Sequence, residues 1–335
     1  MMRCELRVSF AGPLCSVQDA GRVGWLRYGV PGSGPMDRRA LAVVNAALGN
    51  APGAAGVEVS LGGLALDCIA GEVGFAVAGG GFDVRLGGQV MGPWGVGTLQ
   101  AGQRLVLRGG GWGSWATLGF AGDLVAQGWL GSVSTHSQSG LGGGMLSSGQ
   151  MLVIERAERR AAREGDLPVP DWARPAGPVR VTLGPQERFF DAGVQAAFLG
   201  EGFALSAACD RMGVRLAGPA LPVNAALDMP SEPILRGSVQ VAGNGVATVM
   251  LADHGTTGGY PKIATVIGAD LDGFVQRRSG DAVRFVAVTP EAAVAAARVT
   301  AGDLGAYLAG VASPRKGLAE RLMSVNLISG VTDGM

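Results

Sequence analysis

The residues with the widest range of chemistry lie in one segment, DHGTTGGYPK, between Asp253 and Lys262. It combines a carboxylate, hydroxyls, a phenol and an ammonium group with the glycines Gly255, Gly258 and Gly259. Glycine lets the backbone approach a ligand closely, and these side chains can exchange hydrogen bonds and protons. An apolar run precedes the segment and a β-branched run follows it, so we predict a strand, a glycine loop and a second strand. The alternative is an ordinary hairpin that carries a surface lysine.

A second polar segment, DRMGVRL, places Arg211 and Arg215 four positions apart with a glycine between them. Planar guanidinium groups bind carboxylates and phosphates through paired hydrogen bonds, so this spacing suits recognition of an anionic group. Gln240, on a predicted strand, is a further polar candidate. The alternative is that Arg211 or Arg215 pairs with a neighbouring acid and locks the loop.

A third candidate is the long segment from Ser16 to Asp37, which is too rich in glycine for a helix. It carries Gln18, Asp19 and Arg22 together with aromatic residues, so we predict an ordered loop of the kind that is often functional. The alternative is a β-arch in which Asp19 and Arg22 satisfy each other.

Length, charge and composition exclude several classes of function. The 335 residues can bury a large core and suggest two domains. Lysine plus arginine equals aspartate plus glutamate, 27 each, so no net charge attracts nucleic acid or an anionic membrane. Glu5 and Arg7 interrupt any signal peptide and no long apolar run follows, so we expect a cytoplasmic protein that does not bind membranes. Four scattered cysteines and two histidines predict no metal site.

The elements that position these residues are mainly β-strands. With 58 glycines between short apolar runs, the chain predicts a turn-rich β protein with a few short helices. One helix is expected from Met36 to Leu48, with Pro35 at its start and Gly49 at its end. Others are expected from Gln186 to Leu199 and, as a short helix, after the capping residue Thr289.

Repeated prolines mark a domain boundary near the middle of the chain. We predict an N-terminal β domain (1–165), a proline-rich linker (166–178) and a C-terminal β domain (179–335). The final segment, 314–335, ends in an apolar run that could add a strand to the core.

An internal repeat is suggested by residues that recur at a fixed offset of 174 positions. The pairs are Glu58 and Glu232, Gly63 and Gly237, and Gly71 and Gly245. Gly102 and Gly280 match at the similar offset of 178. The two halves are therefore predicted to be related β domains.

Six ordered motifs, which span nearly the whole chain, resemble one family. They are SVQDAGRVGWLRYGVPGSGPMD, Gly49-Asn50, GSVSTHSQSGLGG, DRMGVRL, SVQVAGNG and DHGTTGGYPKIATVIGADL. The family is variously called KipA, allophanate hydrolase subunit 2, biotin-dependent carboxyltransferase or component C of the prokaryotic 5-oxoprolinase. The resemblance implies two β-barrel-like domains related to the cyclophilin-like fold.

The resemblance implies three activities. The leading expectation is component C of an ATP-dependent 5-oxoprolinase, inactive alone, which opens a small lactam, 5-oxoproline, to glutamate with a KipI-like component B and a lactam-utilisation component A. The second is a urea/allophanate-type carboxyltransferase that uses carboxybiotin on a separate carrier. The third is a KipA-like regulator that counters a kinase inhibitor. Two positions depart from the family pattern and bear on specificity, since Gly255 replaces glutamine and Val133 replaces arginine.

Both enzymatic activities act on an amide or urea unit whose oxygen gains negative charge, so hydrogen-bond donors aimed at that oxygen lower the barrier. The expected catalytic residues are Lys262, Tyr260 and Asp253. The expected substrate-binding residues are Arg211, Arg215, Gln240, Thr257, Gly258, Gly259, Gln18, Asp19 and Arg22. In this scheme an arginine holds a carboxylate or phosphoryl group, and Asp253 or Asp19 takes a proton if burial raises its pKa.

Overall fold

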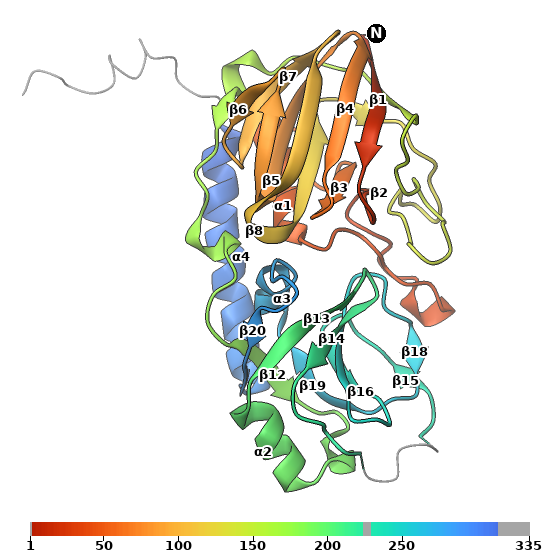
Figure 1. The fold of residues 1–335 in the computed structure, drawn as a ribbon, viewed down its shortest axis with the longest axis vertical. Helices are drawn as coiled ribbons and strands as arrows, with labels where there is room; N and C mark the ends of the chain where they lie inside the picture. Colours follow the sequence, from red (N-terminus) through yellow and green to blue (C-terminus); the bar gives the residue numbers. More distant parts are fainter. Residues whose placement is uncertain (1, 224–228, 314–335) are drawn as a thin grey trace, which may run out of the picture.

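The protein consists of two β-rich halves that lie end to end, with one long helix, α4 (Pro290–Ala312), running beside both (Figure 1). A computed structural model describes residues 2–223 and 229–313. The expected mainly β, barrel-like architecture is confirmed. The strand expected within 314–335 lies outside the described residues.

The first half is built on one sheet, in which the described residues provide eleven strands. These are β1 (Arg3–Ala11), β2 (Ser16–Gln18), β3 (Gly56–Ser60), β4 (Leu64–Ala70), β5 (Glu72–Leu86), β6 (Gln89–Met91), β7 (Gly95–Gln100), β8 (Arg104–Phe120), β9 (Asp123–Leu124), β10 (Met151–Glu155) and β11 (Gly165–Asp166). The main order is β11-β7-β5-β8-β4-β1-β10-β9, with β3 joining β2 to β8.

The second half contains an eight-stranded sheet in the order β20-β13-β14-β17-β16-β19-β12-β21, counted over the described residues. Its strands are β12 (Val179–Leu183), β13 (Phe203–Cys209), β14 (Gly213–Ala217), β16 (Ser238–Val241), β17 (Ala247–Met250), β19 (Lys262–Val266), β20 (Ala282–Val283) and β21 (Phe285–Ala287). Two short strands, β15 (Glu232–Pro233) and β18 (Thr257–Gly258), pair with each other beside it.

Glycines allow β5 and β8 to bend and wrap the first sheet around its core. The pairing of these strands shifts register around Gly81, and Gly79 and Gly113 have positive φ values of 117° and 79°. A Cβ atom at Gly110 would lie only 2.0 Å from the carbonyl oxygen of Gly81. Larger residues would therefore separate the two strands where they bend.

Helix α1 (Arg38–Leu48) packs on the first sheet and begins later than expected. Asp37 is the N-cap, and its Oδ1 accepts a hydrogen bond from the Ala40 amide at 3.0 Å. Pro35 is therefore not the first helical residue, and Met36 is buried instead in the core of the second half. Gly49 ends the helix as predicted, with φ of 72°.

Two of the other predicted helices differ in extent. The segment after Gln186 forms a 3-10 turn and then α2 (Ala192–Gly200), because Asp191 interrupts it in an extended conformation. The expected short helix after Thr289 is α4 (Pro290–Ala312), which has 23 residues, and Thr289 caps it as predicted. Helix α3 (Gly268–Phe274) follows β19. The 3-10 turns are η1 (Leu26–Tyr28), η2 (Ala161–Arg163), η3 (Asp171–Ala173) and η4 (Glu187–Phe189).

The halves are joined by buried polar contacts as well as by apolar packing. The Gln276 side chain, after α3, donates to Asp37 Oδ2 at 2.7 Å and to the Trp115 carbonyl at 2.9 Å. Its oxygen accepts hydrogen bonds from the amides of Ser114 and Trp115 at 2.9 and 3.1 Å. Because these contacts fix β8 and α1 against the second half, residues from both halves can form one site.

The glycines of the predicted repeat share the left-handed backbone conformation. Their φ values are 86° and 95° for Gly63 and Gly237, 79° and 78° for Gly71 and Gly245, and 84° and 90° for Gly102 and Gly280. Non-glycine residues rarely adopt these φ values. The two halves therefore have glycine turns of similar backbone conformation at the positions that correspond in the repeat. Among the described residues, no helix is both long and apolar enough to cross a membrane.

Candidate functional site

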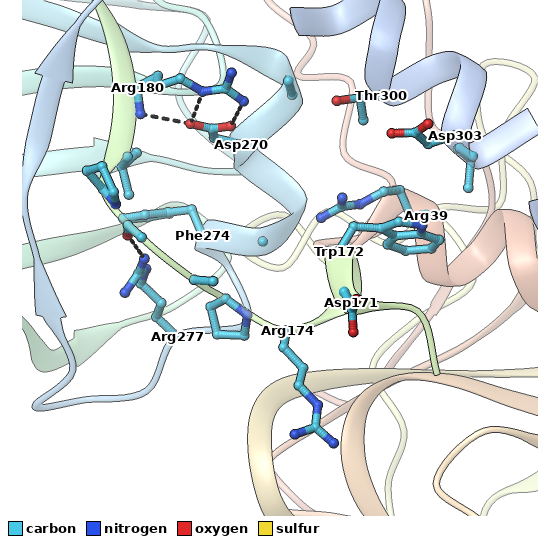
Figure 2. A pocket seen from close by; sticks show the side chains of 18 residues that line it. Arg39, Asp171, Trp172, Arg174, Arg180, Asp270, Phe274, Arg277, Thr300 and Asp303 are labelled. Atoms are coloured by element: carbon cyan, nitrogen blue, oxygen red, sulfur yellow. Dashed lines mark hydrogen bonds and ion pairs between the residues drawn. The ribbon is translucent and has the colours of Figure 1, made fainter. Parts of the chain in front are cut away.

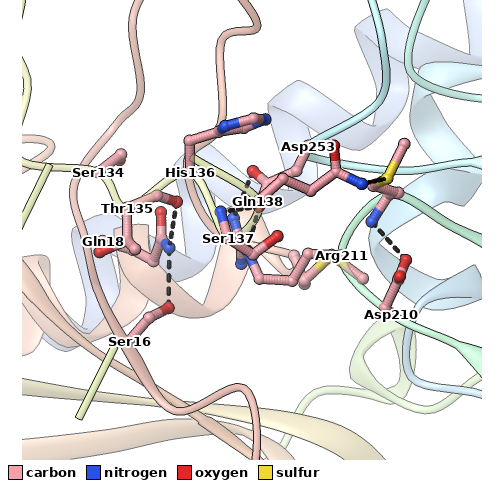
Figure 3. Close-up of polar contacts among 12 residues, drawn as sticks. Ser16, Gln18, Ser134, Thr135, His136, Ser137, Gln138, Asp210, Arg211 and Asp253 are labelled. Carbon is pink, nitrogen blue, oxygen red and sulfur yellow. Dashed lines mark hydrogen bonds and ion pairs between the residues drawn. The ribbon is translucent and has the colours of Figure 1, made fainter. Parts of the chain in front are cut away.

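Arg211 lies at the boundary between the halves, in the turn between β13 and β14, with its side chain fully buried (Figure 3). Its Nε donates to Asp253 Oδ2 at 2.9 Å, and its Nη2 donates to Asp253 Oδ1 at 3.2 Å and to the Gly34 carbonyl at 2.6 Å. Its Nη1 donates to Glu58 Oε1. The guanidinium is occupied by protein partners, which is the contact that the alternative of a locked loop describes, and substrate binding by Arg211 stays a prediction.

The same contacts bear on the condition set for Asp253, which was to take a proton if burial raised its pKa. Burial raises the pKa of its carboxyl group, but the charge and hydrogen bonds of Arg211 and the hydrogen bonds from Ser137 outweigh burial and hold the pKa below its usual value. A carboxylate in this state is a poor proton acceptor. Asp253 therefore anchors the start of the glycine loop to Arg211 and to the Ser137 amide, which donates to it at 2.9 Å.

Arg215 does not act together with Arg211. It lies on β14 opposite Thr248, and its side chain is exposed, whereas Arg211 is buried in the preceding turn. The structure therefore does not bring the two arginines together, and the expected binding of an anionic group by Arg215 stays a prediction. A spacing of four positions suggested proximity, but Arg211 is buried before β14 begins at Gly213, whereas Arg215 is exposed on that strand.

Asp19 is held in a loop of hydroxyl and amide donors. Its Oδ1 accepts hydrogen bonds from Ser132 Oγ, Ser134 Oγ and the Gly21 amide at 2.5, 2.6 and 2.9 Å. Its Oδ2 accepts from the Val133 amide at 2.8 Å. Burial raises the pKa of Asp19, but these hydrogen bonds outweigh it and the pKa is lowered. The condition for Asp19 to take a proton is not met, and the residue instead fixes the loop that contains Val133.

Replacing Asp19 with asparagine is expected to destabilise the protein by about 1 to 3 kcal/mol, because one donor of the loop would lose its acceptor. The pKa of Asp19 is lower in the folded state than in the unfolded state. The carboxylate therefore stabilises the fold fully at pH values above the unfolded-state pKa, and this stabilisation is lost as the pH falls through the folded-state pKa. Urea unfolding of both proteins across this acidic range should show the difference shrinking as the pH falls. A difference that does not change with pH would contradict this role.

Gln18 and Arg22 complete this polar region with one unsatisfied atom each. Gln18 Nε2 donates to Ser16 Oγ at 2.9 Å and to the Thr135 carbonyl at 3.1 Å. Arg22 Nε donates to the Trp129 carbonyl at 3.1 Å, and its guanidinium lies over the Trp129 ring. Gln18 Oε1 and Arg22 Nη1 are buried without a partner in the described part of the chain. The alternative arch in which Asp19 and Arg22 satisfy each other is not observed, since each has other partners.

Lys262 begins β19 and is the buried basic residue of the glycine loop. Only 2% of it is exposed, and its Nζ has no hydrogen-bond partner among the residues that the structure describes. Burial lowers the pKa of its amine, and nearby Glu232 opposes this effect. An unpaired buried amine costs stability, which makes Lys262 a candidate for contact with a ligand.

Sequence reasoning missed two residues beside Lys262. Gln186 is fully buried, its Oε1 accepts a hydrogen bond from the Lys262 amide at 2.8 Å, and its Nε2 donates to Glu232 Oε2. In the internal repeat Glu232 corresponds to Glu58, and Glu58 is the partner of Arg211. This correspondence is the sequence signal from which Glu232 could have been identified as a site residue. Gln240 pairs with Lys262 across the strands, and its Nε2 donates to the Tyr260 carbonyl at 3.4 Å.

The remaining loop residues lie nearer the surface. Tyr260 is 52% exposed, Thr257 and Gly259 are exposed, and Gly258 is half-buried in the pair of strands β15 and β18. A Cβ atom at Gly258 would approach Ile234 Cδ1 to 2.7 Å, so a larger residue there would require the Ile234 side chain to move. The loop thus runs from the Arg211 anchor at Asp253 to the buried amine of Lys262, with its polar middle exposed.

The described residues contain no cluster of three or more histidine, cysteine, aspartate or glutamate residues that could hold a metal ion. Around Lys262 the structure brings together a buried amine, side-chain amides and glycine backbone. Such groups can bind an anion or polarise a carbonyl oxygen.

Comparison with known proteins agrees with this picture. Residues 28–287 match the family model described as carboxyltransferase domain, subdomain A and B. The chain is 33% identical to the C subunit of Escherichia coli 5-oxoprolinase over 295 residues, which cover 87% of this chain and 94% of that protein. It is also 33% identical to the C subunit of Haemophilus influenzae 5-oxoprolinase, over 82% of this chain and 88% of the relative. The structure of Kluyveromyces lactis urea carboxylase matches with a TM-score of 0.81 at 24% identity, covering 92% of this chain and 29% of that one, and shows the shared fold.

Proposed function

Because this chain belongs to the carboxyltransferase domain family, subdomain A and B, we propose that it is component C of an ATP-dependent 5-oxoprolinase. The observation that carries the proposal is the similarity to the Escherichia coli C subunit, which extends over 94% of that protein. In the proposed complex, the chain acts with a KipI-like component B and a lactam-utilisation component A, in the cytoplasm, and is inactive alone.

The chemistry proposed for this chain is polarisation of the lactam. When the ring amide of 5-oxoproline is attacked, its carbonyl oxygen gains negative charge, and a donor in a water-poor site stabilises that charge. Lys262 supports this role, since its amine is buried and no described group occupies it. Gln240 and the glycine backbone of residues 258–259 are proposed to line the same position, while Tyr260 and Thr257 contact substrate or partner from the exposed side.

The test is reconstitution of the three components. Purified chain, component B and component A are mixed with 5-oxoproline and ATP, and glutamate release is followed, with mixtures lacking one component or ATP as controls. We expect release only in the complete mixture. Glutamate release that is the same with and without this chain would overturn the proposal.

A second function is favoured by the family model and by the fold shared with urea carboxylase. In this case the chain transfers a carboxyl group from carboxybiotin on a separate carrier to a urea-like acceptor. Carboxylation that avidin inhibits, without any glutamate release from 5-oxoproline, would favour this function. Binding to a KipI-like protein without turnover of either substrate would favour a regulatory role.

A further inference from the structure

Glu232 acts on the buried amine of Lys262 without making a hydrogen bond to it. Burial lowers the pKa of this amine, and the charge of the Glu232 carboxylate opposes that effect. The amine has no hydrogen-bond partner among the described residues. A direct ion pair would occupy the donors of the amine, whereas a carboxylate nearby favours the protonated form and leaves its donors available to a ligand.

Buried contacts fix the position of the Glu232 carboxylate. Gln186, which is fully buried, donates from Nε2 to Glu232 Oε2, and its Oε1 accepts a hydrogen bond from the Lys262 amide at 2.8 Å. The backbone of Glu232 pairs with Gly258 between β15 and β18. Gln186 therefore connects the carboxylate to the strand that carries the lysine, so the place of the negative charge relative to the amine is set by the fold.

The other charged groups around β19 do not replace Glu232 in this role. From η4, which packs against β19, Glu187 and Arg188 are both exposed. From β12, which pairs with β19, Arg180 donates to Asp270 at 2.6 and 3.1 Å (Figure 2). In the described part of the chain, Glu232 is accordingly the carboxylate that acts on the amine.

Two donors on adjacent strands can serve a ligand here. One is the Lys262 amine, and the other is the side-chain amide of Gln240, which lies opposite Lys262 on β16. Gln240 Nε2 makes one long hydrogen bond, at 3.4 Å, to the carbonyl of Tyr260, whose phenol is exposed. The same nitrogen lies 3.5 Å from the position that a Cβ atom at Gly258 would take. Because the amide is neutral, Lys262 supplies the positive charge of this pair of donors.

The balance of charge decides which kind of ligand fits. A carbonyl oxygen can accept hydrogen bonds from both the amine and the amide, and it brings no net negative charge toward Glu232. A carboxylate or phosphate is attracted by the ammonium group but is also repelled by the Glu232 carboxylate. In a buried site this repulsion is stronger than in water, because charges interact more strongly at a low dielectric constant. The arrangement therefore favours a neutral carbonyl.

We propose that Glu232 is the positioning residue of Lys262, that its carboxylate balances the ammonium charge, and that the site takes the neutral carbonyl of an amide or urea rather than an anion. The lactam oxygen of 5-oxoproline then faces Lys262, and its carboxylate points away. The identity of the substrate rests on the proposed function, whereas the coupling of the two charges is a property of the free chain.

The coupling is tested by a pH titration of the full chain labelled with ¹³C at the ε-carbon of lysine, followed by NMR. Lys262 and Lys316 are the only lysines, so Lys262→Met assigns both signals. We expect the midpoint of the Lys262 signal to move to lower pH in Glu232→Gln, because the ammonium form loses its counter-charge. A glutamine oxygen can still accept the hydrogen bond from Gln186, so the contact is kept while the charge is removed.

Glu187→Gln provides the matched control, since it removes an exposed carboxylate from η4, and it should leave the midpoint in place. A Lys262 midpoint that is the same in wild type and Glu232→Gln would overturn the role of Glu232.

The ligand class is tested with two probes at a pH below both midpoints. They are 2-pyrrolidinone, a neutral lactam, and formate, a small anion, and the Lys262 signal reports their binding. Wild type should respond to 2-pyrrolidinone, and it should bind formate at least about tenfold more weakly than Glu232→Gln does. Equal binding of formate by the two proteins, or no response of wild type to 2-pyrrolidinone, would overturn the preference for a neutral carbonyl.

Failure of this inference and failure of the proposed function give different results. If the complete mixture of three components releases no glutamate but the Lys262 midpoint shifts as expected, the lactam reaction is removed and Glu232 remains the partner of Lys262. Glutamate release without a shift of the midpoint has the opposite meaning.

Discussion

Replacing Lys262 with methionine is expected to lower the turnover of the reconstituted complex by about 100-fold to 1,000-fold, the usual effect of removing one donor to a developing oxyanion. Methionine has a similar length and no charge, so it fills the buried space without donating a hydrogen bond. Steady-state glutamate release at saturating 5-oxoproline measures the effect. Lys316→Met provides the matched control, because Lys262 and Lys316 are the only lysines of the chain.

The same variant separates a functional lysine from a structural one. The folded-state pKa of Lys262 lies below the value of 10.5 expected in the unfolded chain, so at neutral pH the unfolded state binds the proton more readily and the buried amine costs stability. Lys262→Met is therefore expected to leave the free energy of unfolding unchanged or to raise it. A variant that loses activity because it unfolds more easily would contradict the assignment.

Replacing Arg211 with methionine is expected to destabilise the protein by about 3 to 5 kcal/mol, because Glu58 and Asp253 would remain buried without their common partner. Glu58 comes from β3 of the first half and Asp253 from the loop of the second, so the change also weakens the junction between halves. Urea denaturation measures the loss. Arg215→Met is the matched control from the same motif, and since Arg215 is exposed its effect should stay within about 0.5 kcal/mol.

A small effect of Arg211→Met on stability, combined with weaker substrate binding, would restore the role that the sequence suggested for this arginine. The structure predicts the opposite result for Arg211→Met. Stability should fall strongly, and turnover should fall only because the glycine loop is no longer anchored at Asp253. Comparing the KM and kcat of the folded fraction with those of wild type distinguishes these outcomes.

Local sequence signals predicted the features that depend on a few neighbouring residues. Gly49 ends α1 and Thr289 caps α4, because left-handed turns and side-chain caps are set within one turn of the chain. The two strands that flank the glycine loop, β17 and β19, also follow from local composition, but the short strand β18 within that loop was not predicted. The length of α4 was missed, since Gly302 and Gly305 reduce helix propensity and contacts with α1 and α3 override it.

The candidate site was harder to predict, because its partners are distant in sequence. Arg211 and Glu58 are 153 positions apart, and no spacing rule connects them. Whether Arg211 meets an acid or a ligand depends on how the two halves dock, and the same holds for the pKa of Asp253. Burial of Lys262 next to Gln186 likewise follows from the pairing of β19 with its neighbours, and only the repeat of Glu58 at Glu232 pointed to it.

The most direct measurement is the number of ATP molecules consumed and glutamate molecules formed when this chain is added last to components A and B with 5-oxoproline. We predict that both products rise together on addition of the wild-type chain, and that Lys262→Met restores assembly of the complex with little turnover. Equal rates for the wild-type chain and Lys262→Met, or ATP use without glutamate, would contradict the proposed role of this lysine.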